Sequence, residues 1–148
     1  MGTSKSKRRV KIVESIASAI SSKKIFDTID YRNRNEDYIK QYMHQPLINE
    51  LEELYENLEL SKSMDKDIVK QKAKDCLLWE GDVNTTVNNF TFFGTQHRPD
   101  FVVKIDKLSV AVEVKKGETG SSLREGIGQS LVYSSAFDFV VYLYVDIS

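Results

Sequence analysis

The segment HRPDFVVKIDKLSVAVEVKKG, residues 97–117, contains three charged residues whose spacing could support chemistry. They are the acids Asp100 and Glu113 and the lysine Lys115. The apolar residues on both sides of Asp106-Lys107 predict two strands that are joined by a two-residue hairpin turn. In the register that this turn sets, Asp100 lies directly opposite Glu113. Lys115 follows two residues later, on the same face of its strand.

Two carboxylates that face each other across a strand pair repel each other, so this arrangement does not favour stability. A divalent cation between Asp100 and Glu113 would turn the repulsion into coordination, because hard cations bind carboxylate oxygens. The ammonium of Lys115 would then lie next to whatever the cation holds. A structural interpretation stays open, in which these charged residues simply lie on a solvated strand face.

The residues after the hairpin predict a helix, which opens with a capping-box pattern from Ser122 to Glu125. Gln129 and Tyr133 stand one turn apart on one face of this helix. Its expected core face consists of Leu123, Ile127 and Leu131. Gly126 and Gly128 weaken a helix, which indicates that a backbone or a ligand approaches closely there.

The run FVVYLYV, residues 139–145, is typical of a strand that is covered on both faces. The order strand, helix, strand predicts a right-handed crossover, which places this strand parallel to the one that carries Glu113. Tyr142 and Tyr144 could form a stacking platform for bases. Packing against the core is their expected role.

Residues 36–59 form the longest helical pattern, with Asn35 as the expected cap. Pro46 lies inside this pattern and is expected to kink or divide the helix. The apolar stripe consists of Ile39, Met43, Leu47, Leu51, Leu54 and Leu58. Glu36 lies on the centre line of that stripe, whereas Asp37 points away. Glu36 therefore either has a partner in the core or lies in water at the helix end.

The remaining patterns are shorter. Residues 10–20 predict a helix whose buried face consists of Val10, Val13, Ile16 and Ile20. A connector anchored by Ile25 and Phe26 follows, then a helix over residues 65–79 and a strand over residues 90–94. Cys76 lies in the helical pattern and is expected to be a small core residue rather than a nucleophile.

The order of these elements and residues resembles the PD-(D/E)XK nuclease superfamily. Its motif is carried by Pro99-Asp100 and, after twelve further residues, by Glu113-Val114-Lys115. Gln129 and Tyr133 resemble the Gln-x-x-x-Tyr element of several branches, and Glu36 resembles the acid of the first helix. The run around Glu36, with Pro-Leu-Ile after it, is similar to the N-terminal nuclease domains of type I restriction motor subunits. The resemblance covers roughly residues 36–146.

The resemblance implies an α/β fold with a restriction-endonuclease-like αβββαβ core, a mixed sheet flanked by helices, and extra N-terminal helices. Residues 1–34 would be a basic arm and an N-terminal helix, and residues 35–148 would be the nuclease-like domain. Members of this fold commonly continue with another helix and strand. We therefore expect the domain to be truncated at its C-terminus or to begin a larger protein.

The resemblance also implies a metal site. Asp100, Glu113, the carbonyl of Val114 and Glu36 would hold Mg²⁺ or Mn²⁺, which polarises a phosphodiester and lowers the pKa of water. Lys115 would orient or deprotonate the attacking water.

Further residues are expected around this centre. Gln129 and Tyr133 would contact the phosphate backbone, and Arg98 could also touch phosphate. Glu50 or Glu80 could supply the helix acid in place of Glu36. His97 is expected to be an ordinary surface residue.

Composition limits the classes of function. The net charge of −1 over 148 residues differs from the basic excess of proteins that coat nucleic acid. A local patch would have to supply the contact, and the obvious one is SKSKRRVK, residues 4–11, although a mobile solubilising arm is its expected role. One cysteine cannot form an internal disulfide, and no apolar run is long enough to span a membrane. We expect a cytoplasmic protein, although the sequence does not separate cytoplasm from nucleus.

The expected function is a metal-dependent endonuclease that hydrolyses the phosphodiester bonds of DNA, although the sequence does not separate DNA from RNA. It would act as a homodimer or with an additional domain or subunit. The alternative is a non-catalytic nucleic-acid-binding or interaction module that retains the nuclease fold. The joint presence of Asp100, Glu113 and Lys115 argues against that alternative.

Overall fold

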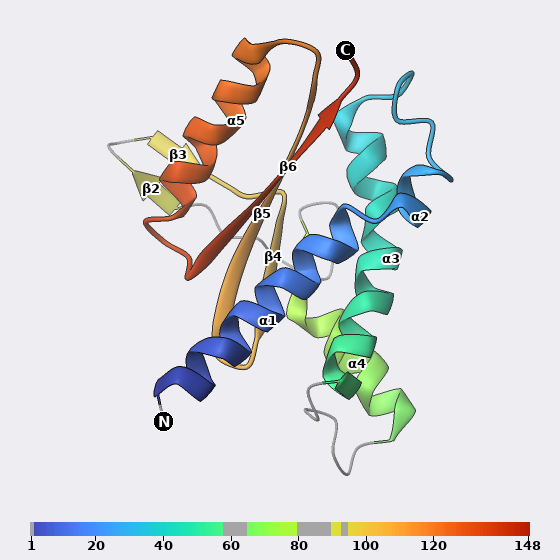
Figure 1. The fold of residues 1–148 in the computed structure, drawn as a ribbon, viewed down its shortest axis with the longest axis vertical. Coiled ribbons are helices and arrows are strands. Elements are labelled where there is room, and N and C mark those ends of the chain that lie inside the picture. Colours follow the sequence, from blue (N-terminus) through green and yellow to red (C-terminus); the bar gives the residue numbers. More distant parts are fainter. Residues whose placement is uncertain (1, 58–64, 80–89, 93–94) are drawn as a thin grey trace.

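The chain forms a four-stranded mixed sheet that is flanked by helices (Figure 1). The computed structural model describes residues 2–57, 65–79, 90–92 and 95–148. The helices are α1 (Gly2–Ile20), α2 (Lys23–Phe26), α3 (Glu36–Asn57), α4 (Lys66–Cys76) and α5 (Gly120–Tyr133). The strands are β1 (Leu77–Trp79), β2 (Phe90–Phe92), β3 (Thr95–His97), β4 (Phe101–Ile105), β5 (Leu108–Gly117) and β6 (Phe139–Asp146). The predicted α/β class is therefore confirmed.

The strand order in the main sheet is β1-β4-β5-β6. β4 is antiparallel to both β1 and β5, whereas β6 runs parallel to β5, as the strand, helix, strand order predicts. β2 and β3 form a separate antiparallel pair. The strand predicted over residues 90–94 is therefore present in β2, but it lies outside the main sheet.

The β4–β5 hairpin has the predicted turn and register. Ile105 pairs with Leu108, and the ladder continues to the pair Phe101–Val112. Asp106 and Lys107 both have positive φ, 50° and 62°. Two such residues in succession form the type I′ turn, whose twist matches that of antiparallel strands.

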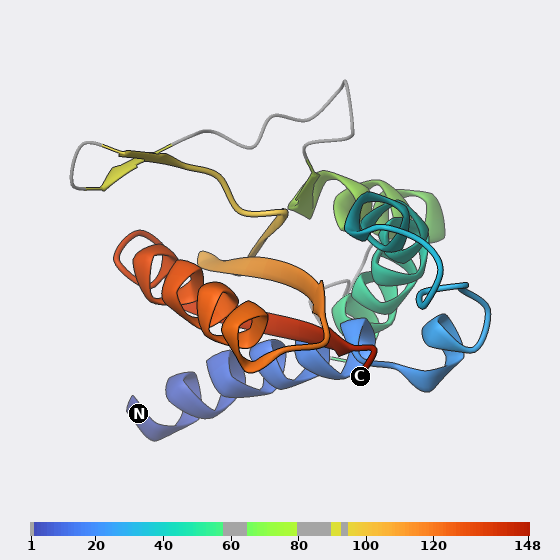
Figure 2. The ribbon, with the colours of Figure 1, turned by 90° about the horizontal axis from the view of Figure 1, so that it is seen from above.

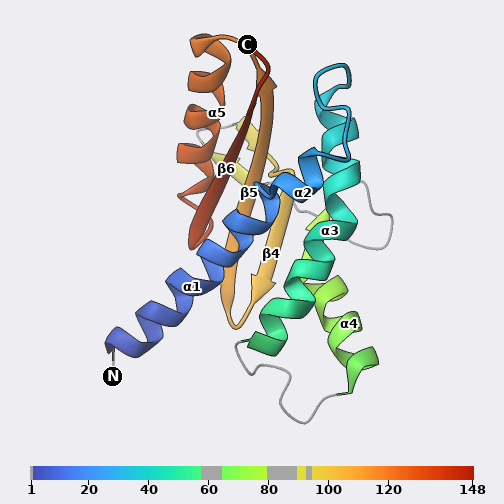
Figure 3. The ribbon, with the colours of Figure 1, turned by 45° about the vertical axis from the view of Figure 1, so that its right-hand side comes forward.

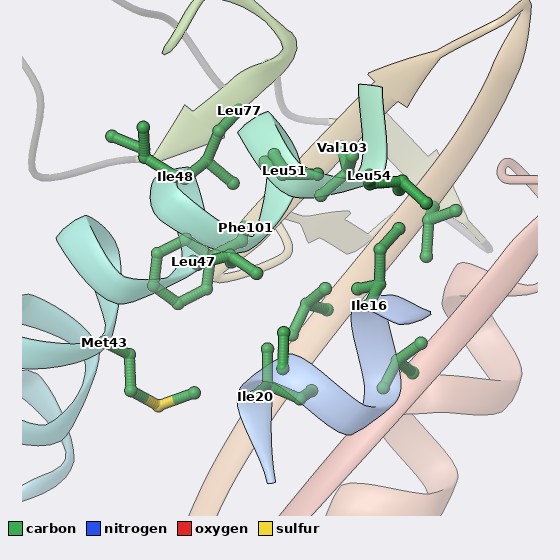
Figure 4. Close-up of a cluster of buried hydrophobic side chains, with 14 of the residues drawn as sticks. Ile16, Ile20, Met43, Leu47, Ile48, Leu51, Leu54, Leu77, Phe101 and Val103 are labelled. Carbon is green, nitrogen blue, oxygen red and sulfur yellow. The ribbon is translucent and has the colours of Figure 1, made fainter. Parts of the chain in front are cut away.

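The two faces of the sheet are covered differently, as Figure 2 and Figure 3 show. α5 packs on one face of β5 and β6, whereas α1, α3 and α4 lie on the opposite side. That opposite side contains the main apolar core (Figure 4). Its buried residues include Ile16, Ile20, Met43, Leu47, Leu51, Leu54, Phe101 and Val103. The predicted stripe of α3 is thus confirmed as far as Leu54, and Leu58 lies outside the described residues.

α3 begins as predicted, because Asn35 Oδ1 accepts a hydrogen bond from the backbone N–H of Tyr38 at 2.9 Å. The helix continues through Pro46 without a break, so the prediction that Pro46 could divide it is wrong. Met43 and Leu47 are fully buried on either side of the proline. Tertiary packing of this kind supplies most of the stability of a helix in a protein, and here it outweighs one missing hydrogen bond.

The basic run near the N-terminus belongs to α1 and not to an extended arm. Arg8 forms an ion pair with Asp106 at 2.9 Å, and Arg9 forms one with Asp138 at 3.3 Å. These contacts join the helix to the hairpin turn and to the start of β6. Val10, which was predicted to face the core, is 46% exposed, because the buried face of α1 consists of Ile12, Ile16, Ala19 and Ile20.

The helix predicted over residues 65–79 ends earlier than expected. α4 stops at Cys76, and the next three residues form β1, which pairs with β4. Pairing with β4 satisfies the backbone groups that a longer helix would have satisfied internally. Cys76 is 5% exposed, and burial raises the pKa of its thiol to about 12. The prediction of a core residue is therefore confirmed.

α5 turns its apolar residues outward, which contradicts the predicted core face. Leu123, Ile127 and Leu131 are exposed, whereas Gly126 and Tyr133 are buried. A Cβ atom on Gly126 would collide with the ring of Tyr142, so a close approach occurs there, but by a side chain and not by the predicted backbone or ligand. A Cβ on Gly128 would meet open space, and the same prediction is wrong at that position.

The start of α5 also differs from the predicted capping box. Thr119 is the cap, and its hydroxyl accepts a hydrogen bond from the backbone N–H of Ser122 at 3.2 Å. The helix therefore begins at Gly120, before Ser122. Glu125 is free of a capping role and forms an ion pair with Lys115 at 3.4 Å.

β6 is an edge strand, because β5 is its one partner in the main sheet as described. Val141 and Val145 are buried and the other apolar residues are half-buried, with α5 on one face of the strand and α1 on the other, so the predicted cover on both faces is present but incomplete. Tyr142 and Tyr144 donate hydrogen bonds to the carbonyls of Leu123 and Thr119, each at 3.2 Å. They hold α5 on the sheet. Within the described residues, no helix is both long and apolar enough to cross a membrane.

Candidate active site

The last part of β5 extends beyond its pairing with β4, which ends at Val112. Alternate residues of a strand direct their backbone N–H groups to the same edge, so Val114 and Lys116 present theirs where β4 is missing. Two carboxylates take these donors. Asp100 Oδ2 accepts from Val114 at 2.8 Å, and Glu36 Oε1 accepts from Lys116 at 3.0 Å. The fold therefore brings both predicted acids to one edge of β5.

Asp100 is 8% exposed and is paired with Lys40, which is also 8% exposed. Lys40 Nζ lies 2.9 Å from Asp100 Oδ1 and 3.3 Å from Asp37 Oδ1. Burial by itself would lower the pKa of Lys40, but the charge and hydrogen bond of Asp100, together with Asp37, raise it. Lys40 is therefore a cation, and it neutralises an aspartate that has almost no access to water.

Glu113 differs from Asp100 in its hydrogen bonding. Its Oε2 atom is buried and has no hydrogen-bond partner among the described residues. Burial, followed by the charge of Asp100, raises the pKa of Glu113 to about 8. Burial, together with the predicted repulsion across the hairpin, therefore favours the protonated form of the Glu113 carboxyl.

Lys115 lies on the same face of β5 as Glu113, as predicted. Its ammonium is 3.9 Å from Glu36 Oε1 and 3.4 Å from Glu125 Oε1, and its side chain is 25% exposed. We call Glu36, Lys40, Asp100, Glu113 and Lys115 the carboxylate–lysine cluster. Its members come from α3, from the residue before β4 and from β5.

Tyr133 and Gln129 of α5 lie beside the backbone that leads to Asp100. Tyr133 is fully buried, and its hydroxyl donates to the carbonyl of Arg98 at 2.9 Å while accepting from Gln129 Nε2 at 3.1 Å. This chain of hydrogen bonds fixes the backbone just before Asp100. In this arrangement both side chains serve the protein itself, and their predicted contact with phosphate stays a prediction. The side chain of Arg98 is exposed.

Of the three candidates for the helix acid, the structure describes two, Glu36 and Glu50, and they lie far apart. Glu36 is in the cluster, whereas Glu50 is exposed and lies 14 residues further along α3, about 21 Å away at 1.5 Å per residue. Glu50 therefore cannot fill the role in this arrangement. Glu80 lies outside the described residues, as does the side chain of His97.

Within the described residues, no group of three or more histidine, cysteine, aspartate or glutamate side chains is gathered closely enough to hold a metal ion. Two carboxylates and one carbonyl are nevertheless suited to a hard cation. Glu113 Oε2 is an unused buried oxygen beside Asp100. The carbonyl of Val114 points to the same edge as its N–H, toward Asp100. Mg²⁺ keeps several waters, so this small donor set fits it.

Lys40 is the member of the cluster that sequence reasoning missed. It stands one helical turn after Glu36, and residues four apart on a helix lie on the same side. The available signal was thus a lysine directly above an inward-facing glutamate. Its partner is 60 residues away in the sequence, and no local pattern identifies such a partner.

A hollow of about 590 Å³ opens beside the cluster, between the start of α3 and the start of α5. Its lining includes Asn35, Glu36, Lys116, Thr119 and Ser122. Lys116 Nζ donates to the carbonyls of Arg32 and Arg34, which fixes the segment before α3 against the end of β5. The hollow therefore gives access to the Glu36 side of the cluster.

Comparison with known proteins adds no identification. No family model matches this chain, and no match was found among curated proteins or solved structures. The resemblance to PD-(D/E)XK nucleases therefore depends on the chain's own motif residues and on the order of its elements.

Proposed function

We propose that this protein is a metal-dependent endonuclease that hydrolyses phosphodiester bonds of DNA. The observation that carries the proposal is the pair Asp100 and Glu113, held side by side with an unused buried oxygen on Glu113. Such a pair is unfavourable without a cation and useful with one. Strongly shifted pKa values of this kind gather at functional sites.

The order of elements supports the proposal. α3 precedes β1, β4 and β5, and α5 and β6 follow. This is the helix, three strands, helix, strand order that the resemblance implies, with α4 and the β2–β3 pair inserted. Asp100 lies just before β4 and Glu113 lies late in β5, and these positions support the resemblance.

Four residues of the cluster have a role in the proposed reaction. Asp100, Glu113 and the Val114 carbonyl would hold Mg²⁺ or Mn²⁺, with Glu36 as a further ligand directly or through water. The cation supplies Lewis-acid polarisation of the phosphodiester and lowers the pKa of water. As an ammonium, Lys115 would orient the attacking water and balance charge on the phosphate; to deprotonate that water instead, it would first have to lose a proton of its own.

A nucleic-acid substrate, which we propose to be DNA, is supported by exposed arginines near the cluster. Arg32, Arg34 and Arg98 are exposed, and all three belong to backbone segments that are hydrogen-bonded to the cluster's surroundings. Arg32 and Arg34 belong to the segment that reaches the hollow at Asn35, on a chain whose net charge is −1. Binding that depends on a few phosphate contacts is weak and falls steeply with salt.

The test is a cleavage panel of supercoiled, linear, single-stranded and branched DNA together with RNA. Each substrate is incubated with Mg²⁺, Mn²⁺ or EDTA. We expect cutting of DNA with either metal and none with EDTA. Lys115→Ala should lower the rate at least about 100-fold, which is the usual contribution of a positioned proton-transfer group. Lys104→Ala is the matched control, because Lys104 is an exposed lysine on β4.

The non-catalytic alternative has one observation in its favour. Lys40, Val114 and Lys116 already satisfy the oxygens of Asp100 and Glu36 from within the protein. A binding module would shift DNA in a gel assay with EDTA present, and would cut none of the substrates with metal. Metal-dependent cutting that survives in Lys115→Ala would count against the assigned role of that lysine and point to a contaminating nuclease.

A further inference from the structure

Lys40 and Asp100 are the two charged residues whose side chains are buried in the part of the chain that the structure describes. Their ion pair joins α3 to the residue before β4 across 60 positions of sequence. Both oxygens of Asp100 are occupied, Oδ1 by Lys40 Nζ at 2.9 Å and Oδ2 by the Val114 N–H at 2.8 Å. A cation that binds Asp100 must therefore approach an oxygen that already accepts a hydrogen bond, and on Oδ1 the donor is the positively charged Lys40.

The charges decide what happens on such an approach. A divalent ion bound to Asp100 and Glu113 would lie within a few ångströms of the Lys40 ammonium. Even at an effective dielectric constant of about 20, like charges at that distance repel each other strongly. Asp37 offers the ammonium another position, since its carboxylate is 3.3 Å from Lys40 Nζ and its side chain is 84% exposed.

We propose that Lys40 is a built-in counter-ion that competes with divalent metal for Asp100. The inference rests on the proposed function, and it adds a control of metal affinity that the nuclease motif does not contain. In the metal-free protein the ammonium balances Asp100 and holds α3 against the hairpin. Metal binding would displace the ammonium from Oδ1 toward Asp37 and water. The free-energy cost of this displacement lowers the protein's affinity for the metal.

A merely structural role for Lys40 makes a different prediction. If the lysine only fastened α3 to the hairpin, its removal would lower stability and would leave metal affinity unchanged or reduced. If Lys40 competes with the metal, its removal must change stability and metal affinity in opposite directions. Stability without metal falls because Asp100 loses its partner, and metal affinity rises because the competitor is gone.

The experiment compares wild-type protein with Lys40→Met, and with Lys104→Met as the control for the loss of one positive charge. Mn²⁺ binding is measured by isothermal titration calorimetry, and melting temperatures are measured in EDTA and in Mn²⁺. We expect Lys40→Met to melt lower than wild type in EDTA and to bind Mn²⁺ about tenfold tighter or more. Lys104→Met should match wild type in both measurements.

Lys40→Gln is the second variant, in case Lys40→Met fails to fold, because it keeps a donor for Asp100 and removes only the charge. Equal or weaker Mn²⁺ binding by a folded Lys40 variant, with wild type still binding, would overturn the counter-ion proposal and leave the nuclease proposal standing. No Mn²⁺ binding by wild type or by either variant would overturn both. The two failures are therefore distinguishable.

Discussion

The two ends of α3 lie against very different surroundings. Met43, Leu47 and Leu51 are buried in the apolar core against α1 and the strands (Figure 4). One and two turns before them, the same side of the helix presents Lys40 and Glu36 to the carboxylate–lysine cluster. An apolar residue at position 40 would continue the stripe, and buried ion pairs are often no more stabilising than apolar replacements.

The comparison teaches where stability and function are separated in this protein. The apolar core stabilises through buried area, which does not change with pH or with metal. The carboxylate–lysine cluster depends on charge, so pH and metal should both change its contribution to stability. The following predictions test that separation.

Leu47→Ala should have the largest effect on stability. Leu47 is fully buried, and truncation of such a leucine costs about 4 kcal/mol through lost burial and the cavity left behind. Denaturant unfolding measures the loss. Any stabilisation by Mn²⁺ should be the same in variant and wild type, and a loss of that stabilisation would show that core and cluster are not independent.

Asp100→Ala should come next, with a loss of about 3 kcal/mol, because it leaves the buried ammonium of Lys40 without its main partner. Adding Lys40→Met to Asp100→Ala should restore much of the lost stability, since no buried charge remains unpaired. A double-mutant cycle in urea measures the coupling. Additive losses would mean that the ion pair is not coupled in the folded protein.

Glu113 should make stability depend on pH. Its pKa is about 8 in the folded protein and near 4.5 in the unfolded chain, so the folded state binds the proton more tightly. The resulting stabilisation is complete below about pH 4.5 and is lost as pH rises through about 8. Glu113→Gln should flatten this fall in metal-free melts. An identical pH profile for variant and wild type would contradict the assignment.

The smallest effects are expected on the other face of the sheet, where two glycines of α5 form a matched pair. Gly126→Ala should cost about 1 to 2 kcal/mol, because the added methyl group collides with the ring of Tyr142. Gly128→Ala should stabilise by about 0.5 to 1 kcal/mol, because its site is open and alanine favours the helix. Thermal melts of both variants test the pair, and two effects of the same sign would contradict the packing of α5.

The sequence predicts best where local chemistry decides the structure. The Asp106-Lys107 turn fixes the register of β4 and β5, and that register brings Asp100 to Glu113. The cap at Asn35 and the α3 stripe are local signals of the same kind. Each of them depends on residues a few positions apart, so a pattern in the chain is sufficient.

The sequence predicts the structure less well where a residue distant in the chain determines the local arrangement. Gly126 of α5 faces the sheet, and the apolar residues of the helix face outward, because Tyr142 of β6 fills the space beneath Gly126. β1 replaces the end of a helix because β4 offers it a ladder. Lys40 was missed for the same reason, since its partner Asp100 enters from another element.

The separation of partners along the chain also has a kinetic consequence. Lys40 and Asp100 are 60 residues apart, and Glu36 and Lys116 are 80 residues apart, whereas the hairpin closes through neighbouring residues. Hairpins form within microseconds, and contacts between distant residues form later because a long loop must first be closed. A refolding chain would then acquire the hairpin before α3 docks against it. Affinity for Mn²⁺ would therefore report the completion of folding, and during refolding it should develop after the strands have formed.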